Sequence, residues 1–296
     1  MKFNFREFAI IPRQSDPWVK SLVGTMSYET KSAGALSGGT CCYAGSRLPV
    51  RGPLRELKSP YIAFLGGTEV FGRFVKTPMS DVGESLLKRT CVNLAAVNAG
   101  LDAFASDGAL LAIARQAELA VVQVLGAQNV SNRYYRVHPR RNDRFLQAQP
   151  ALKTLFPEVD YTDFHFNKHL LTSLQALSEE RFAQVRQHLQ DAWVDRMTQM
   201  IAELQGRVVL LWLRYDLNGT AAFNQEPVLV ERSMIQALED RVEGLVEIDV
   251  SPAGLVDDFD GMILGDLDFP AAQHMLGPKE QARIGCLLAE TLQELL

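Results

Sequence analysis

The chain has 296 residues, of which 47% are hydrophobic and 22% are charged, and its formal net charge is -5. This composition is typical of a globular protein, and the acidic balance disfavours a general nucleic-acid binder, which would need a basic face. No run approaches the roughly 20 apolar residues of a membrane span. The four cysteines lack metal-site spacing and favour a reducing compartment. We therefore expect a cytoplasmic protein that binds neither nucleic acid nor membranes.

Residues 1–58 are rich in Gly, Ser, Pro and Arg and predict an irregular N-terminal leader. Within it, residues 1–25 are expected to be a poorly ordered extension, with Met26 as an alternative start of the chain. From residue 60 onward, short apolar runs rich in β-branched residues predict strands that are buried on both faces. These runs lie at 61–65, 91–95, 119–125, 207–213 and 245–250.

Helical patterns separate these runs. Apolar residues recur at steps of three and four from Ser178 to Gln205, with Ser178 as a candidate cap and Gly206 as a stop signal. Other helical patterns lie at about 79–88, at about 107–117 with Asp107 near its start, and at about 278–296. Strands that alternate with helices predict a parallel sheet covered on both faces. Residues 59–296 are therefore predicted to form one α/β domain, with an insertion at about 127–177.

The residues that follow each predicted strand are the candidate site, because open parallel sheets bind ligands beyond the carboxyl ends of their strands. The first strand runs into GGTEVFG, where Gly66 and Gly67 precede the hydroxyl of Thr68. Asn98 follows the second strand, and His274 directly precedes the last predicted helix. Three interpretations of Thr68 stay open: a helix cap, a ligand contact and a catalytic nucleophile.

These segments resemble, in the same order, the four sequence blocks of the SGNH (GDSL-type) hydrolases. Leu65-Gly66-Gly67-Thr68, followed by Gly72, resembles the Leu-Gly-Gly-Ser variant of the first block, with threonine in place of the nucleophilic serine. Val92-Asn93-Leu94-Ala95 is similar to the second block, whose glycine N–H helps to form the oxyanion hole. The resemblance covers about residues 60–130 and 245–296. It implies an SGNH-like, flavodoxin-like three-layer sandwich with a parallel sheet of about five strands.

The other two blocks complete the implied site. Gly126-Ala127-Gln128-Asn129 is similar to Gly-x-Asn-Asp, so Gln128 or, after a one-residue shift, Asn129 takes the place of the oxyanion-binding asparagine. His274 matches the histidine of Asp-x-x-His, but Ala271 stands where the aspartate belongs, and Asp268 or a backbone carbonyl is the alternative partner. The resemblance thus implies Thr68 as nucleophile and His274 as base, with Ala95 and either Gln128 or Asn129 as oxyanion donors.

The segment at 132–145, NRYYRVHPRRNDRF, concentrates cationic side chains in an acidic chain. Arginine matches carboxylate, sulfate or phosphate in two-point contacts, so an anion site is one interpretation. Salt bridges to the acidic remainder are the other. The residues concerned are Arg133, Arg136, His138, Arg140, Arg141 and Arg144. The chain as a whole, including SRLPVRGP upstream and VHPRRNDRF downstream, also resembles an uncharacterised bacterial family of unknown function.

Two functions are consistent with these patterns. The first is an acyl-ester hydrolase or acyltransferase for a substrate with an anionic group, with Thr68 in the usual serine position. The second is a non-catalytic protein that binds an anionic small molecule or glycan in the same cleft. In both, Gly66, Gly67 and Asn98 would join the arginines in holding the ligand. We expect no cofactor. We also expect no metal, because His165 and His169 have no third ligand at a suitable spacing. The oligomeric state stays open.

Overall fold

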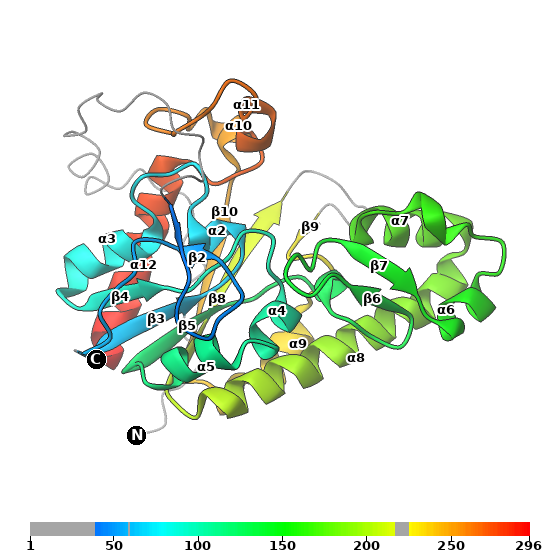
Figure 1. The fold of residues 1–296 in the computed structure, drawn as a ribbon, viewed down its shortest axis with the longest axis horizontal. Coiled ribbons are helices and arrows are strands. Elements are labelled where there is room, and N and C mark those ends of the chain that lie inside the picture. The colour runs from blue at the N-terminus through cyan, green and yellow to red at the C-terminus, as the bar shows by residue number, and fades with distance from the viewer. Residues whose placement is uncertain (1–38, 59, 217–224) are drawn as a thin grey trace.

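A six-stranded, mostly parallel sheet forms the centre of the protein (Figure 1). The structure, a computed structural model, describes residues 39–58, 60–216 and 225–296, so the expectations for residues 1–25 and Met26 lie outside the described residues. The parallel strands are β3 (Tyr61–Leu65), β4 (Thr90–Asn93), β5 (Leu119–Gln123), β8 (Val208–Asp216) and β10 (Gly244–Val250). The short strand β9 (Gln225–Glu226) pairs antiparallel with the end of β8. All five predicted strands are present, and the α/β class is confirmed.

The strands lie side by side in the order β10-β8-β5-β3-β4. The chain therefore begins inside the sheet at β3, steps outward to β4, and returns past β3 to β5 before it continues to β8 and β10. The connections that leave β3 and β5 run in opposite directions. In a parallel sheet such a switch point leaves a crevice at the carboxyl ends of the two strands, where ligands bind.

The central strands are buried on both faces. In β3, Tyr61, Ala63 and Leu65 pack into one core cluster, whereas Ile62 and Phe64 pack into the other. Successive side chains of a strand point to opposite faces, so a strand between two helical layers must be apolar throughout. For this reason the strands are visible in the sequence as continuous apolar runs.

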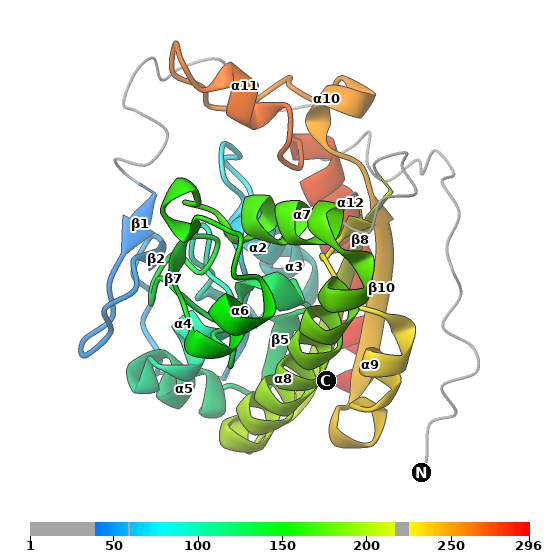
Figure 2. The same cartoon turned by 90° about the vertical axis from the view of Figure 1, so that its right-hand side faces the viewer.

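Helices lie against both faces of the sheet and produce three layers (Figures 1 and 2). One face carries α3 (Met79–Leu87) and α12 (Pro278–Leu295), and the other carries α4 (Leu101–Ala105), α5 (Gly108–Arg115), α8 (Glu179–Leu204) and α9 (Arg232–Gln236). Shorter segments are α2 (Thr68–Phe71), α10 (Ala253–Val256), α11 (Phe269–Ala272) and the 3-10 turns Ala127–Asn129, Tyr161–Asp163 and Glu239–Arg241. Within the described ranges, no helix is long and apolar enough to cross a membrane.

The helix boundaries follow local capping signals. The Ser178 side chain accepts a backbone N–H at the start of α8, and the Asp107 side chain does the same at the start of α5. The predicted cap at Ser178 is therefore confirmed. The expected stop at Gly206 is wrong by one residue, because Gln205, with a φ of 51°, takes the left-handed conformation that ends α8.

Residues 39–58, which were expected to be irregular, contain two short antiparallel strands, β1 (Thr40–Cys41) and β2 (Val50–Arg51). The Arg51 guanidinium attaches this segment to the domain, because it donates to four backbone carbonyl groups at the end of α2 and just beyond it. The acceptors are Phe71, Gly72, Val75 and Lys76. Tyr43 and Leu48 are buried in the main core cluster. The described part of the leader is thus a packed edge of the domain.

The insertion at 127–177 contains regular structure that the sequence did not indicate. A hairpin of β6 (Tyr135–Val137) and β7 (Phe145–Ala148) precedes α6 (Pro150–Leu155) and α7 (Asn167–Leu177) (Figure 1). Tyr135, Leu152 and Phe156 are fully buried in the same core cluster as one face of the sheet. The insertion and the sheet therefore share a core.

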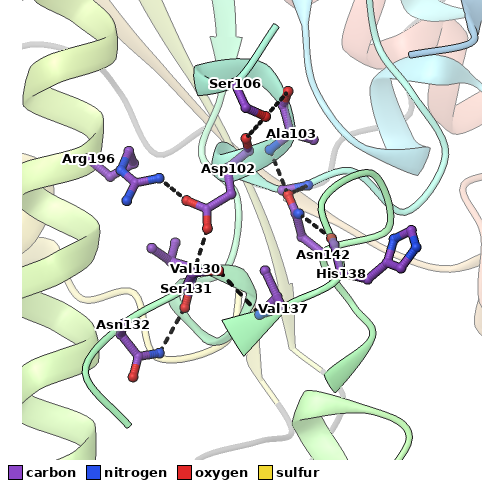
Figure 3. A network of polar contacts seen from close by, with 11 residues as sticks. Asp102, Ala103, Ser106, Val130, Ser131, Asn132, Val137, His138, Asn142 and Arg196 are labelled. Atoms are coloured by element: carbon purple, nitrogen blue, oxygen red, sulfur yellow. Dashed lines mark hydrogen bonds and ion pairs between the residues drawn. The ribbon is translucent and has the colours of Figure 1, made fainter. Parts of the chain in front are cut away.

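A buried amide ties the hairpin to the helical layer (Figure 3). Asn142 is fully buried, and its Oδ1 accepts hydrogen bonds from the N–H groups of Gly100 at 2.8 Å and Ala103 at 3.0 Å. The first N–H groups of a helix have no partner within the helix, so Asn142 satisfies the start of α4 from a distant part of the chain. Its Nδ2 donates to the carbonyl oxygen of His138 and closes the loop between β6 and β7.

Asp102 of α4 forms a second attachment (Figure 3). Its carboxylate accepts the N–H of Ser131 at 2.7 Å and forms an ion pair with Arg196 of α8. The hairpin, α4 and α8 are therefore joined through one carboxylate. This junction orients the insertion relative to the carboxyl edge of the sheet.

Replacement of Asn142 by alanine should lower the free energy of unfolding by roughly 2–4 kcal/mol, because two helix N–H groups and one carbonyl lose their partner. Urea unfolding followed by circular dichroism measures this difference. Gln147→Ala, at an exposed position of β7, serves as the control and should change stability by no more than about 0.5 kcal/mol. Equal stabilities of Asn142→Ala and the wild type would contradict the anchoring role.

Candidate functional site

A cleft of about 410 Å³ lies at the carboxyl ends of the strands, at the switch point between β3 and β5. Its lining comes from the loops after β3, β4, β5 and β10, from the ends of β8 and β9, and from the insertion. The predicted site residues that border it are Gly67, Thr68, Asn98, Gln128, Asn129 and His274. The structure thus brings together the hydroxyl, amide and imidazole groups that stand at separate strand ends in the sequence.

Thr68 is the first residue of α2, and its hydroxyl contacts the loop after β4 instead of capping its own helix. The N-cap of α2 is Gly67, and no side chain caps this helix. Thr68 Oγ1 accepts the N–H of Asn98 at 3.0 Å and donates to Asn98 Oδ1 at 3.4 Å. The helix-cap interpretation of Thr68 is therefore wrong. With 9% of its surface exposed, Thr68 is largely buried at the edge of the cleft.

Asn98 adopts a left-handed backbone conformation beside the Thr68 hydroxyl. Its φ is 59°, a conformation that costs most residues other than glycine about 1–2 kcal/mol and that asparagine tolerates better. The N–H of Ala95, expected as an oxyanion donor, donates instead to Asn93 Oδ1 at 3.1 Å, and Ala95 is fully buried outside the cleft lining. The structure contradicts the role of Ala95. The backbone donor that reaches the Thr68 hydroxyl belongs to Asn98.

The buried amide of Gln123 holds the turn after β3. Gln123 is the last residue of β5, and its Oε1 accepts the N–H of Gly67 at 2.8 Å while its Nε2 donates to Glu69 Oε2 at 2.9 Å. A Cβ atom on Gly66 would lie 2.6 Å from the same Oε1, so the close approach of this turn to β5 requires glycine. Gln123 is not among the residues predicted for the site, although it is the one polar residue inside the apolar run LAVVQVL.

The two amides of the third block have different surroundings. Gln128 is 7% exposed and lines the cleft, and its Oε1 has no hydrogen-bond partner among the described residues. Asn129 also borders the cleft, but its Oδ1 accepts a hydrogen bond from Asn167 Nδ2 at 3.0 Å. Asn129 is therefore tied to α7, and Gln128 is the amide with unused hydrogen-bonding capacity.

His274 is exposed, follows α11 and borders the same cleft as Thr68. In residues 39–58, 60–216 and 225–296, no hydrogen bond joins its ring to Thr68 or to a carboxylate. Asp268, the alternative partner, uses Oδ2 to accept the N–H of Gly265 at 2.9 Å. The implied nucleophile and base thus share a cleft without a direct hydrogen bond.

The cationic residues of the 132–145 segment lie outside the cleft lining. Arg133 lies over the Tyr134 ring, and Arg144 lies over the Phe166 ring. Arg141 lies beside Asp143, and His138 Nδ1 accepts the N–H groups of Arg140 and Arg141. Arg136 borders a second hollow near α8. The structure does not bring these side chains together with Thr68. Anion binding by this segment stays a prediction.

The charged residues that do line the cleft were missed by the sequence analysis. They are Glu69, Asp143, Lys168 and Glu226. The Lys168 Nζ lies 3.2 Å from Glu226 Oε1. Burial raises the pKa of Glu226, and Lys168 opposes that shift. Burial also raises the pKa of Tyr215, and the negative charge of Glu69 adds to it. Within the described part of the chain, no group of three His, Cys, Asp or Glu side chains is arranged to hold a metal ion.

Asn98→Ala should lower the free energy of unfolding by about 1–2 kcal/mol relative to Asn98→Gly, because only alanine is strained at positive φ. Both variants lose the asparagine side chain, so their difference isolates the backbone conformation. Chemical denaturation of the two proteins under identical conditions measures it. Coincident unfolding curves would show that the N–H of Asn98 is not held in this conformation beside Thr68.

Among solved structures, a lipase from a goat rumen metagenome (Lip_vut3) is similar at 10% identity and a TM-score of 0.41, over 78% of this chain and 97% of the lipase. A likeness at this level carries no argument about the reaction. No curated protein matches. The model of the family described as "Domain of unknown function (DUF6473)" matches residues 26–296, and the chain belongs to this family.

Proposed function

We propose that this protein is an SGNH-like acyl-ester hydrolase or acyltransferase whose active site is the cleft at the switch point. The observation that carries the proposal is the position of Thr68: its hydroxyl is presented at the carboxyl end of β3, in contact with the backbone N–H of Asn98. The strand order β10-β8-β5-β3-β4 supports it, because it is the flavodoxin-like order with the crevice at this switch point.

The proposed reaction uses the residues that border the cleft. Thr68 Oγ1 attacks the ester carbonyl, His274 accepts the hydroxyl proton, and the alcohol leaves with that proton. The oxyanion of the tetrahedral intermediate accepts hydrogen bonds from the N–H of Asn98 and the side-chain amide of Gln128. Water or a second alcohol then releases the acyl group from Thr68. Catalytic hydrogen bonds often tighten only when substrate binds, so His274 is assigned to close on Thr68 in that complex.

Asn98 replaces Ala95 in this mechanism. A backbone donor within 3.0 Å of the nucleophile lies close to the position where the carbonyl oxygen becomes charged. The left-handed conformation of Asn98 turns its N–H toward Thr68. The arginines at 132–145 have no part in the proposed reaction, because none of them lines the cleft.

A second candidate function is ligand binding in this cleft without turnover. It is favoured by one observation: the Thr68 hydroxyl already donates to Asn98 Oδ1, and no described base accepts its proton. In that case threonine would shape the cleft and bind ligand without a covalent step. Measurement of ester hydrolysis separates the two functions.

The full-length protein should hydrolyse p-nitrophenyl propionate, and Thr68→Ala and His274→Ala should each reduce kcat by roughly 100-fold or more. Thr68→Ser should retain activity, because the hydroxyl remains and the β-methyl group is lost. The matched controls are Thr172→Ala and His165→Ala, at exposed positions outside the cleft lining, which should leave the rate unchanged. Wild-type hydrolysis that survives in Thr68→Ala would exclude the threonine nucleophile, and no hydrolysis of any ester would favour binding without turnover.

A further inference from the structure

Three carboxylate residues border the cleft, against one lysine. The carboxylates are Glu69 on α2, Asp143 in the insertion and Glu226 on β9, and the ammonium group is that of Lys168 on α7. No arginine belongs to the lining among the described residues. The sequence led us to expect an anionic ligand, which would need a positively charged cleft. The side chains that line the cleft instead carry more negative than positive charge.

Glu69 is the carboxylate whose charge is least compensated. Its Oε2 accepts a hydrogen bond from the neutral amide of Gln123, and none of the ion pairs among the described residues includes Glu69. Its negative charge contributes to the raised pKa values of both Tyr215 and Glu226, so its field extends across the cleft. Glu69 directly follows the proposed nucleophile in the chain. A cation bound by Glu69 would therefore lie beside the reacting group.

The other two carboxylates, those of Glu226 and Asp143, differ in whether they have a partner. Glu226 Oε1 holds the ammonium group of Lys168 at 3.2 Å, which is direct evidence that a cleft carboxylate pairs with an ammonium group. Asp143 has a buried Oδ1 with no hydrogen-bond partner among the described residues, while its Oδ2 lies 3.9 Å from Arg141. A buried acceptor without a partner is costly, so this oxygen is suited to a ligand that donates hydrogen bonds.

Gln128 provides an independent indication of a hydrogen-bond donor in the ligand. Its side chain is more than nine-tenths buried and lines the cleft, and its Oε1 has no partner among the described residues. Buried polar atoms in folded proteins almost always have a hydrogen-bond partner, either in the protein or in ordered water, so an unpaired acceptor has hydrogen-bonding capacity to spare. Gln128 Oε1 and Asp143 Oδ1 are both acceptors. A primary ammonium group, with three N–H donors and a positive charge, matches acceptors and carboxylates together.

We infer that the cleft binds a primary ammonium group of the ligand against Glu69, with Asp143 and Gln128 as further acceptors, so that the substrate is an amine-bearing ester. The ester part rests on the proposed function, whereas the ammonium site does not. Salt will weaken binding, because the attraction between partly exposed charges is screened.

The first experiment measures binding without turnover. Isothermal titration calorimetry of the full-length protein compares n-butylammonium, n-butanol and butanoate, which share a carbon chain and differ in charge. We expect n-butylammonium to bind at least tenfold more tightly than the other two, and Glu69→Gln to remove that preference. Glu180→Gln, at an exposed position on α8 outside the cleft lining, is the matched control and should bind like the wild type.

Two results would overturn the inference. One is equal or tighter binding of n-butanol or butanoate, the latter being the outcome expected for an anion site. The other is an ammonium preference that persists in Glu69→Gln. Asp143→Asn is the second variant if Glu69→Gln does not fold, as judged by circular dichroism, and a preference unaffected by it would overturn the inference equally.

A kinetic experiment separates this inference from the proposed function. The p-nitrophenyl esters of glycine and propionic acid differ chiefly in an ammonium group in place of a methyl group, and we expect a higher kcat/KM for the glycine ester. In Thr68→Ala, n-butylammonium binding should remain while hydrolysis is lost. Ammonium binding without hydrolysis of either ester would refute the proposed reaction and retain the ammonium site. Hydrolysis of both esters at equal rates would refute the ammonium site and retain the reaction.

Discussion

The arrangement of the cleft depends on the two hydrogen bonds of the Gln123 side-chain amide. This amide lies at the carboxyl end of the central strand β5, accepts the N–H of Gly67 at 2.8 Å and donates to Glu69 at 2.9 Å. One buried group thus fixes both residues that flank Thr68. A buried amide with both ends paired is rigid, and its loss would leave a backbone N–H without a partner. The position of the Thr68 hydroxyl follows from this contact, because the turn has no side-chain cap of its own.

The switch point explains why these contacts produce a cleft. The chain leaves β3 in one direction and β5 in the other, so the loops after the two strands separate instead of packing on each other. The insertion then supplies one wall, with Asp143, Phe166 and Lys168 facing this space. Asn142 and Asp102 determine where that wall stands, because they join the hairpin to α4 and α8. The anchoring of the insertion therefore determines that Asp143 and Lys168 border the cleft, whereas Glu69 and Glu226 come from α2 and β9.

The proposed chemistry and the inferred ligand depend on neighbouring residues of α2. Thr68 presents its hydroxyl to Asn98, and Glu69 presents its carboxylate to Gln123. Two adjacent residues of a helix point in different directions, so one can face the reacting bond while the other contacts the charged group of the substrate. This division would allow the protein to recognise charge without placing a carboxylate on the oxyanion.

Local patterns in the sequence predict the five parallel strands, the helices α3, α5, α8 and α12, and the candidate hydroxyl of Thr68. A strand buried on both faces needs a continuous apolar run, and the starts of α8 and α5 carry the capping side chains Ser178 and Asp107. The groups that meet at the cleft are brought together by long-range contacts of the folded chain. The arginines at 132–145 lie outside the cleft lining, the N–H of Asn98 and not that of Ala95 contacts Thr68, and three carboxylate residues border the cleft. These outcomes depend on hydrogen bonds between residues far apart in the chain, and no local pattern encodes the direction in which a loop side chain points.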